Sequence, residues 1–291
     1  MIARLALLVV TAVWGVTFVQ VKDAVALYPL TAFLGVRFAL ASAVLALPAA
    51  PRLRRLGREG FAAGAVVGAL LAAGFALQTA GLERTTVSST GFITGLYVVL
   101  TPLFGLAIFR TPVGPAVWGA VALAVAGLAL LSGIHAGSPA GDLLVLASAA
   151  AQALQIVAVG RIAARYDALA LTLVQVATAA VAFLAAAVAL GDLSWPRGWT
   201  VWGALVVTAL FASVFALLVQ IWTQRRIGAT QIALIFSLET VFAGLFGYVL
   251  DGDRLGVAGW AGCGLILGGI VLAEPASAAA LRRMVGARRA S

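Results

Sequence analysis

Glu239 lies in the middle of a long apolar segment, Gly228–Leu250, where an acidic side chain is unusual. A helix of about 20 apolar residues spans the hydrocarbon core of a bilayer, so this carboxylate is predicted to lie at mid-membrane. Inserting an acidic side chain there costs roughly 2.5–3.5 kcal/mol, and burial disfavours its charged form. Such a group is suited to contact a substrate or to exchange a proton. The structural alternative is a protonated side chain that only forms hydrogen bonds within a helix bundle.

Arg37 is the second charged residue that the sequence places inside an apolar segment, Leu30–Leu47. A long arginine side chain near the end of a membrane helix can extend to the membrane surface. It can equally balance the charge of Glu239 or bind the carboxylate of a substrate. The sequence leaves these three roles open.

Uncharged polar side chains recur at helical spacing on five other apolar segments. Thr90, Thr94, Tyr97 and Thr101 form one such stripe. Exposing these stripes to lipid would be unfavourable, so they are predicted to line a shared central cavity. Hydrogen bonds between helices, worth about 0.6 kcal/mol each, are the alternative explanation. The predicted substrate-binding residues are Trp14, Phe18, Gln78, Thr94, Tyr97, Gln152, Gln155, Gln220, Trp222 and Glu239.

No constellation typical of an enzyme competes with this cavity. His135 is the single histidine and Cys263 the single cysteine, so neither a metal site nor a disulfide framework is predicted. The sequence contains neither a Walker motif nor a Gly-x-Ser-x-Gly motif. We therefore expect neither an enzyme nor a bound cofactor.

The composition is that of a polytopic membrane protein. Hydrophobic residues make up 63% of the 291 positions and charged residues 10%, whereas a soluble domain has about 25% charged residues. Short connections with turn residues separate ten apolar segments. We predict an all-α integral membrane protein whose ten transmembrane helices are Leu5–Val21, Leu30–Leu47, Phe61–Leu82, Val87–Phe109, Pro115–Ile134, Asp142–Gly160, Leu169–Leu190, Trp199–Thr223, Gly228–Leu250 and Gly256–Ala273.

The basic residues are distributed unequally between the two sides of the predicted bundle. Fourteen lie on the side that carries both termini and four on the other, while Arg37 lies within a segment. Basic residues concentrate in short cytoplasmic loops. Both termini are therefore predicted to be cytoplasmic, and the net charge of +9 indicates membrane topology rather than nucleic-acid binding.

The two halves of the chain resemble each other. A shift of 142 residues places Gln78 on Gln220 and Tyr97 on Glu239, and a shift of 138 places Tyr28 on Tyr166. Because each half has an odd number of spans, the second half enters the membrane from the opposite side. This predicts two inverted five-helix repeats around a central substrate site, with access alternating between the two sides. The predicted units are residues 1–136, residues 137–275 and a basic cytoplasmic tail, 276–291.

Two glycine patterns predict close contacts between helices. One is Gly60-x-x-x-Gly64-x-x-x-Gly68 and the other is Gly264-x-x-x-Gly268. Neither pattern coincides with a polar stripe. We therefore expect both to be packing surfaces.

Several motifs resemble the EamA-type drug/metabolite transporter superfamily. They are the Trp14-Gly15 pair, Arg37, the run Ser237–Gly247 and the acidic, glycine-containing turn Asp251–Gly256. Within the superfamily the sequence is most similar to bacterial amino-acid exporters. The resemblance implies a basket of helices around a central cavity, with the fifth and tenth helices at the periphery.

Two departures from the family pattern concern the ninth and the fourth helix. Many members have proline directly after the glutamate, where this sequence has Thr240. The acidic residue usual after the fourth helix is replaced here by Arg110 and Thr111.

These observations predict an inner-membrane secondary transporter that exports small metabolites, with amino acids, including aromatic ones, as the leading substrates. Transport of nucleotide sugars or lipid precursors and a non-transporting membrane scaffold are the alternatives. The expected partners are a small-molecule substrate and the lipid bilayer. The sequence leaves open whether transport is coupled to protons through Glu239 or is facilitated diffusion. It also leaves the oligomeric state open, and a monomer is compatible with it.

Overall fold

The computed structural model describes residues 2–85, 87–132, 138–250 and 256–273. His135, most of the Asp251–Gly256 turn, the predicted repeat boundary and the basic tail lie outside these ranges. All the regular secondary structure of the described residues is helical. Its elements are α1 (Ile2–Val25), α2 (Leu30–Leu53), α3 (Gly57–Leu82), α4 (Val87–Gly95), α5 (Tyr97–Phe109), α6 (Pro115–Ser132), α7 (Pro139–Ile162), α8 (Ala168–Leu190), α9 (Trp199–Val207), the π-helix η1 (Thr208–Phe215), α10 (Ala216–Gln224), α11 (Ala229–Phe236), α12 (Leu238–Leu250) and α13 (Val257–Leu272).

These elements form ten membrane segments, because three segments are each built from more than one helix. The composite segments are α4 with α5, α9 with η1 and α10, and α11 with α12. Within the described ranges, seven helical stretches are long and apolar enough to cross a membrane, and three shorter apolar helices accompany them. The prediction of an all-α membrane protein with ten segments is therefore confirmed.

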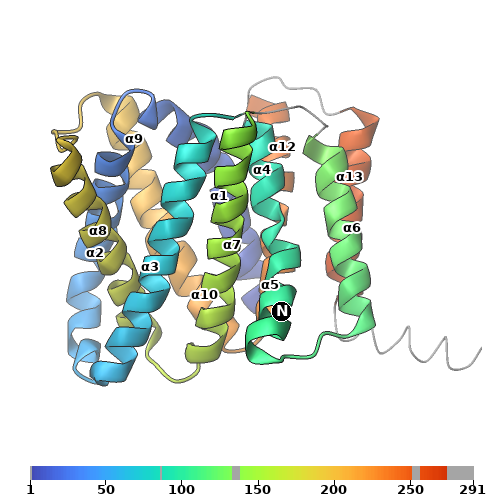
Figure 1. The fold of residues 1–291 in the computed structure, drawn as a ribbon, viewed down its shortest axis with the longest axis horizontal. Coiled ribbons are helices and arrows are strands. Elements are labelled where there is room, and N and C mark those ends of the chain that lie inside the picture. Colours follow the sequence, from blue (N-terminus) through green and yellow to red (C-terminus); the bar gives the residue numbers. More distant parts are fainter. Residues whose placement is uncertain (1, 86, 133–137, 251–255, 274–291) are drawn as a thin grey trace, which may run out of the picture.

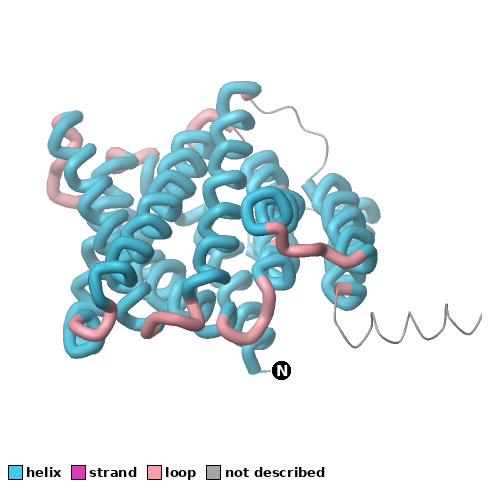
Figure 2. The backbone as a smooth tube through the Cα atoms, turned by 60° about the horizontal axis from the view of Figure 1, so that its bottom comes forward, coloured by secondary structure: helices cyan, strands magenta, loops and turns pink. Residues whose placement is uncertain are grey.

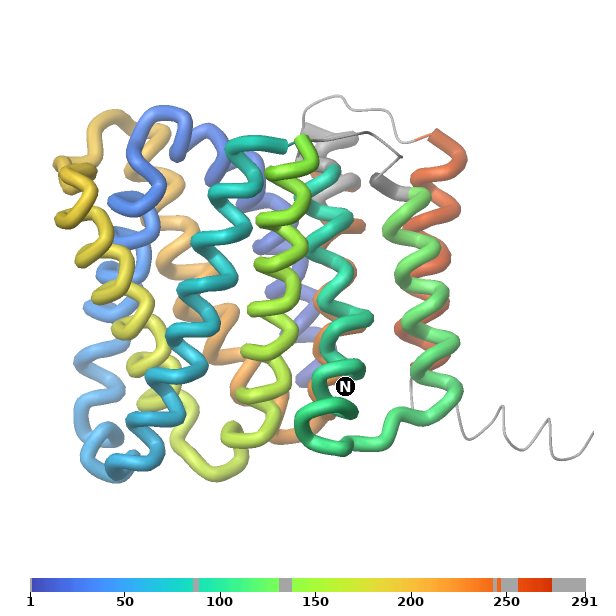
Figure 3. The backbone as a smooth tube through the Cα atoms, viewed as in Figure 1, coloured from blue at the N-terminus to red at the C-terminus, as the bar shows by residue number. Residues whose placement is uncertain are grey.

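The helices run side by side, and the loops gather at the two ends of the bundle (Figures 1 and 2). α1 starts on the side where the N-terminus lies, whereas α7 starts on the opposite side (Figure 3). Five segments separate these two starts. The two halves therefore cross the membrane in opposite directions, as the repeat predicts.

The segment that contains Arg37 is longer than predicted. α2 continues beyond Leu47 through Pro48 and Pro51 to Leu53. A proline lacks the N–H that would bond the preceding turn, but both prolines lie near the end of the helix, where few intrahelical bonds remain to be lost. The helix consequently brings Arg52 next to the start of α8.

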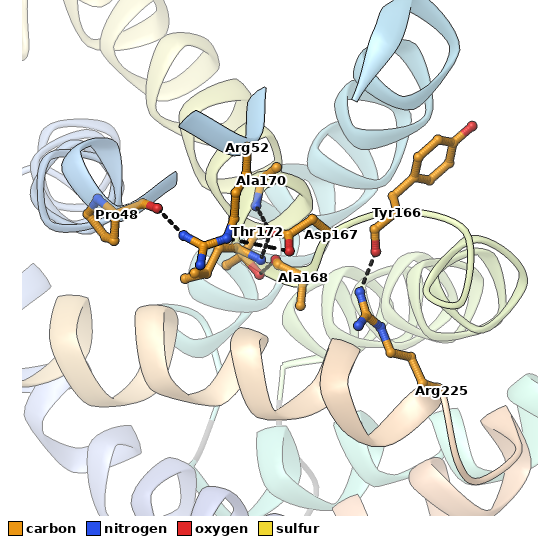
Figure 4. Close-up of polar contacts among 9 residues, drawn as sticks. Pro48, Arg52, Tyr166, Asp167, Ala168, Ala170, Thr172 and Arg225 are labelled. Carbon is orange, nitrogen blue, oxygen red and sulfur yellow. Dashed lines mark hydrogen bonds and ion pairs between the residues drawn. The ribbon is translucent and has the colours of Figure 1, made fainter. Parts of the chain in front are cut away.

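The loop between α7 and α8 is held by two arginines from distant helices (Figure 4). Arg52 lies 3.6 Å from the Asp167 carboxylate, and Asp167 accepts hydrogen bonds from the amides of Leu169 and Ala170 at the start of α8. Arg225 donates to the backbone oxygens of Ala163 and Tyr166. The loop thereby links α2, α8 and α10 on the N-terminal side of the bundle.

The first glycine pattern makes the close contact that the sequence predicts. A Cβ atom added to Gly60 would lie 2.7 Å from the Tyr166 ring, one added to Gly64 2.8 Å from Val174, and one added to Gly68 2.8 Å from the backbone oxygen of Gln175. These distances leave no room for a side chain. α3 therefore packs closely against the start of α8.

The second glycine pattern was predicted wrongly. Gly264 and Gly268 have no atom within 4 Å of an added Cβ, so they face away from the described helices. The contact between α13 and α6 is made on another face of α13, where a Cβ on Gly127 would lie 2.6 Å from the Gly262 oxygen and one on Gly269 2.7 Å from the Ala120 oxygen. Residues 262, 266 and 269 share one helical face, which 264 and 268 do not. α6 and α13 together form the edge of the bundle (Figure 1).

Candidate functional site

Two membrane segments are interrupted at equivalent places in the two halves. α4 ends at Gly95 and α5 begins at Tyr97, and α11 ends at Phe236 and α12 begins at Leu238. At these interruptions the amide of Val99 bonds the oxygen of Leu96 at 3.0 Å, and that of Thr240 bonds the oxygen of Ser237 at 3.3 Å. These three-residue steps tighten the helix locally. Interrupted helices are typical of transporter substrate sites.

Tyr97 and Glu239, which the repeat pairs, both lie in the first turn after an interruption. Both are buried, and Glu239 is close enough to interact electrostatically with the Tyr97 phenol. The amino end of a helix favours a negative charge. The start of α12 therefore offers an anionic side chain a favourable position at mid-membrane.

The π-helix η1 is a third interruption, and the sequence did not predict it. Its Ala212 oxygen accepts a hydrogen bond of 3.0 Å from the Trp14 indole, and its Ser213 hydroxyl accepts one of 3.0 Å from Arg37 Nε. Short π-helical stretches frequently occur at functional sites because they change the direction of neighbouring side chains. Here the stretch anchors one residue of α1 and one of α2.

A central cavity lies between α1, α2, α3, α7 and α10, with Phe236 and Glu239 on either side of the α11–α12 interruption. The space open to the centres of water molecules is about 70 Å³, which holds several waters. The lining reaches Leu82 at the end of α3, on the side opposite the N-terminus (Figure 1). Its residues are Trp14, Thr17, Phe18, Val21, Arg37, Leu71, Phe75, Gln78, Thr79, Leu82, Gln152, Gln155, Ile156, Leu217, Gln220, Phe236 and Glu239.

Seven of the ten predicted substrate-binding residues line this cavity, and Arg37 lines it as well. Thr94 lies behind the wall, where its hydroxyl accepts a hydrogen bond of 3.1 Å from Gln78. Tyr97 is buried in a neighbouring apolar cluster. Both residues are placed to support the lining rather than to form it.

Trp222 does not line the central cavity. It is half-buried, and the Arg226 guanidinium lies over its ring at 4.2 Å. Nine lining residues were not among the predicted ones, and two of them are aromatic, Phe75 and Phe236. Each lies three positions before a predicted residue, so helical spacing was the signal that pointed to them.

Arg37 is buried and does not reach the membrane surface, so the first of its three possible roles is excluded. Its side chain is 3% exposed, and its guanidinium lies 4.6 Å from the centre of the Phe75 ring and 5.3 Å from that of Phe38. Within the described ranges no carboxylate lies within ion-pair distance of it. Arg37 and Glu239 thus line one cavity without a direct salt bridge.

A row of hydrogen-bonded glutamine side chains, called the amide chain below, lies at the end of the central cavity that is nearer the N-terminus. Gln220 donates to Gln155 at 2.9 Å, and Gln155 donates to Gln175 at 3.0 Å. Gln224 donates to the Ile156 oxygen at 2.7 Å. These bonds join α10, α7 and α8 across the centre of the bundle.

A second cavity lies beyond this amide chain, on the side of the N-terminus. Its volume is about 480 Å³, and its lining includes Thr101, Val157, Arg161, Gln224 and Gln231. The two cavities share no lining residue. Gln155 and Ile156 line the central cavity and the next residue of α7, Val157, lines the second, so the two cavities come close to each other along α7.

Comparisons with known proteins agree with this architecture. The EamA-like transporter family matches residues 1–133 and again residues 139–273. An uncharacterized transporter of Archaeoglobus fulgidus is 31% identical over 93% of this chain and 85% of its own length. The uncharacterized inner membrane transporter YedA of Escherichia coli K12 is 26% identical over 89% of this chain and 86% of its own. A solved crystal structure superposes with a TM-score of 0.79 at 20% identity, covering 97% of this chain and 98% of that one, and shares the fold. The chain is a membrane transporter that belongs to the EamA-like transporter family.

Proposed function

We propose that this transporter exports small amphipathic metabolites across the cell inner membrane, with amino acids, including aromatic ones, as its substrates. The observation that carries the proposal is the composition of the central cavity. Four glutamines and four aromatic residues line it, together with one cation and one carboxylate. Amides hydrogen-bond ammonium and carboxylate groups alike, and aromatic rings accept an apolar side chain.

Transport proceeds by alternating access between the two halves. In this proposal, the hydrogen bonds that join Gln220, Gln155 and Gln175 hold α10, α7 and α8 together and keep the central cavity closed toward the second cavity. The interruptions after Gly95 and Phe236 allow half-helices to move relative to each other. Breaking the amide chain would join the two cavities and open the site to the other side.

The N-terminal side of the bundle is cytoplasmic in this proposal, because the short loops on that side carry most of the basic residues. The second cavity is then the cytoplasmic entrance. The repeat units are 1–136 and 137–275, and the basic tail, 276–291, is cytoplasmic.

Proteoliposomes test the proposal directly. Vesicles containing the purified protein and loaded with labelled amino acids are expected to lose label faster than protein-free vesicles. Unlabelled aromatic amino acids added outside are expected to accelerate the loss by exchange. Equal release from both kinds of vesicle across a broad amino-acid panel contradicts the proposal.

The same panel distinguishes the two alternative functions. A nucleotide sugar carries a diphosphate, and Arg37 is the single cation among the residues that line the central cavity. Release of nucleotide sugars or lipid precursors, but of no amino acid, would favour that class. A scaffold would release none of them.

A further inference from the structure

Arg37 is a buried cation whose charge the protein leaves unbalanced within the described ranges. Only its Nε is hydrogen-bonded, to the neutral hydroxyl of Ser213. The side chain lines the central cavity, and no hydrogen bond joins its terminal nitrogens to a described residue. A buried charge without a partner is strongly unfavourable. The guanidinium is therefore positioned to receive an anionic group from the cavity.

The internal repeat shows that the fold does not require a cation at this position. At the shift of 138 that pairs Tyr28 with Tyr166, Arg37 pairs with Gln175 and Thr17 with Gln155. In the second half, the neutral Gln175 side chain accepts a hydrogen bond from Gln155. The first half therefore has a cation that can only donate hydrogen bonds where its counterpart has a neutral amide. The positive charge thus requires an explanation other than helix packing.

The surroundings of Arg37 orient its free end. The Phe38 and Phe75 rings lie within cation–π distance of the guanidinium, and Ser213 holds Nε. A guanidinium is a planar fork with five donors that matches a carboxylate through two parallel hydrogen bonds. Holding the fork by its Nε edge leaves the terminal nitrogens available for such a group.

Glu239 lines the same cavity and defines the charge of the substrate that fits. No described residue donates a hydrogen bond to its carboxylate. A simple anion bound at Arg37 would share the cavity with this acidic side chain. A zwitterion balances both groups, with its carboxylate at Arg37 and its ammonium group attracted to Glu239.

We propose that Arg37 binds the carboxylate of a zwitterionic substrate and is the residue that selects amino acids over their amides and amines. This inference rests on the proposed function, amino-acid export through the central cavity. It assigns the two ends of the substrate to two named side chains. It also predicts that removing the carboxylate from the ligand weakens binding as much as removing the guanidinium from the protein. Making both changes together should weaken binding no further than either change alone.

Binding measurements with three related ligands test the inference. Tryptophan, tryptophanamide and tryptamine share the indole and the amino group, and only tryptophan carries a carboxylate. Dissociation constants are measured for the parent, for Arg37→Gln, which copies the other half, and for Arg37→Lys, which keeps the charge without the fork. Arg226→Gln is the matched control, because Arg226 also lies over an aromatic ring but lines neither of the two cavities described above.

The expected result is specific for the carboxylate. Charge-assisted hydrogen bonds are worth roughly 1.5–3 kcal/mol, or about ten- to a hundredfold in affinity. Arg37→Gln should weaken tryptophan binding by about that factor and leave tryptophanamide within about twofold of the parent. The tryptophan affinity of Arg37→Lys should lie between that of the parent and that of Arg37→Gln. Arg226→Gln should bind all three ligands as the parent does.

Each other outcome has a definite meaning. Equal weakening of tryptophan and tryptophanamide would show that Arg37 supports the fold of the cavity, and the inference would be wrong. Unchanged tryptophan binding by Arg37→Gln would also overturn it. Because each comparison uses the ratio of two ligands on one protein, a partly unfolded variant does not imitate the expected result. If the parent binds indole-3-propionate in an Arg37-dependent way but no amino acid, amino-acid export is wrong and the carboxylate assignment stands.

Discussion

The side chain of Gln220 on α10 donates a 2.9 Å hydrogen bond to the side-chain oxygen of Gln155 on α7. Gln155 in turn donates to Gln175 on α8, so three helices of the second half are joined at one depth. Gln220 and Gln155 line the central cavity, whereas Gln175 does not. The chain can therefore be weakened at Gln175 without removing a side chain from the cavity wall.

Gln175→Leu should favour the conformation that is open to the second cavity, because it removes one buried hydrogen bond from the closed state. A net contribution of about 0.5–1.5 kcal/mol corresponds to a roughly two- to twelvefold shift between conformations. The measurement is labelling of a single cysteine at position 152, in a Cys263→Ala background, by an impermeant thiol reagent added on the N-terminal side. The labelling rate should rise by about that factor. Thr178→Val is the matched control, since Thr178 bonds only the Val174 oxygen of its own helix; an equal rise there would contradict the gating role.

Glu239→Gln should separate substrate movement from proton coupling, because it keeps the size and hydrogen-bonding capacity of the side chain and removes its titration. If Glu239 exchanges protons, the variant equilibrates substrate across vesicles but loses accumulation driven by an imposed pH gradient. Glu83→Gln is the control, since Glu83 is exposed at the end of α3 and lines neither of the two cavities. Identical responses of Glu239→Gln and the parent to the gradient would exclude coupling through Glu239.

Gly127→Ala should destabilise the protein, because the new Cβ would lie 2.6 Å from the Gly262 oxygen between α6 and α13. Overpacking of this kind costs about 1–3 kcal/mol. Gly264→Ala makes the same substitution where nothing lies within 4 Å, and it should leave the stability unchanged or raise it slightly. The check is the melting temperature of each variant in detergent. A larger loss at Gly264 would show that its face is packed.

Asp167→Ala should lower stability by about 0.5–2 kcal/mol, because Asp167 caps the start of α8 through the Leu169 and Ala170 amides. Asp167→Asn retains the cap and removes the ion pair with Arg52 (Figure 4). It should resemble the parent, since exposed ion pairs contribute little. Thermal unfolding of the two variants and of Arg52→Ala distinguishes the cap from the ion pair. A loss in Asp167→Asn as large as in Asp167→Ala would assign the effect to the charge.

The transmembrane segments and their number could be predicted because hydropathy is a local property of the sequence, and the repeat could be predicted by comparing the two halves. Hydropathy over about 20 residues determines which segments enter the bilayer. The polar residues Gln78, Gln152, Gln155 and Gln220 could be assigned to a cavity because few other environments in a membrane accept them. The structure places all four in one lining.

The tertiary structure alone decided which residues of a polar stripe reach the cavity. Helical spacing gives the face of a helix but not its rotation against its neighbours, so Thr94 and Trp222 were predicted as lining residues and lie elsewhere. The same limit explains why Gly264 was wrongly predicted to lie in a helix contact, since a pattern of small residues does not indicate which helix, if any, packs against it. The π-helix before α10 contacts Trp14 and Arg37, which are distant in the sequence, and was seen only in the structure. The sequence places Arg37 within an apolar segment and leaves three roles open, and only the tertiary structure shows that its side chain is buried and lines the cavity.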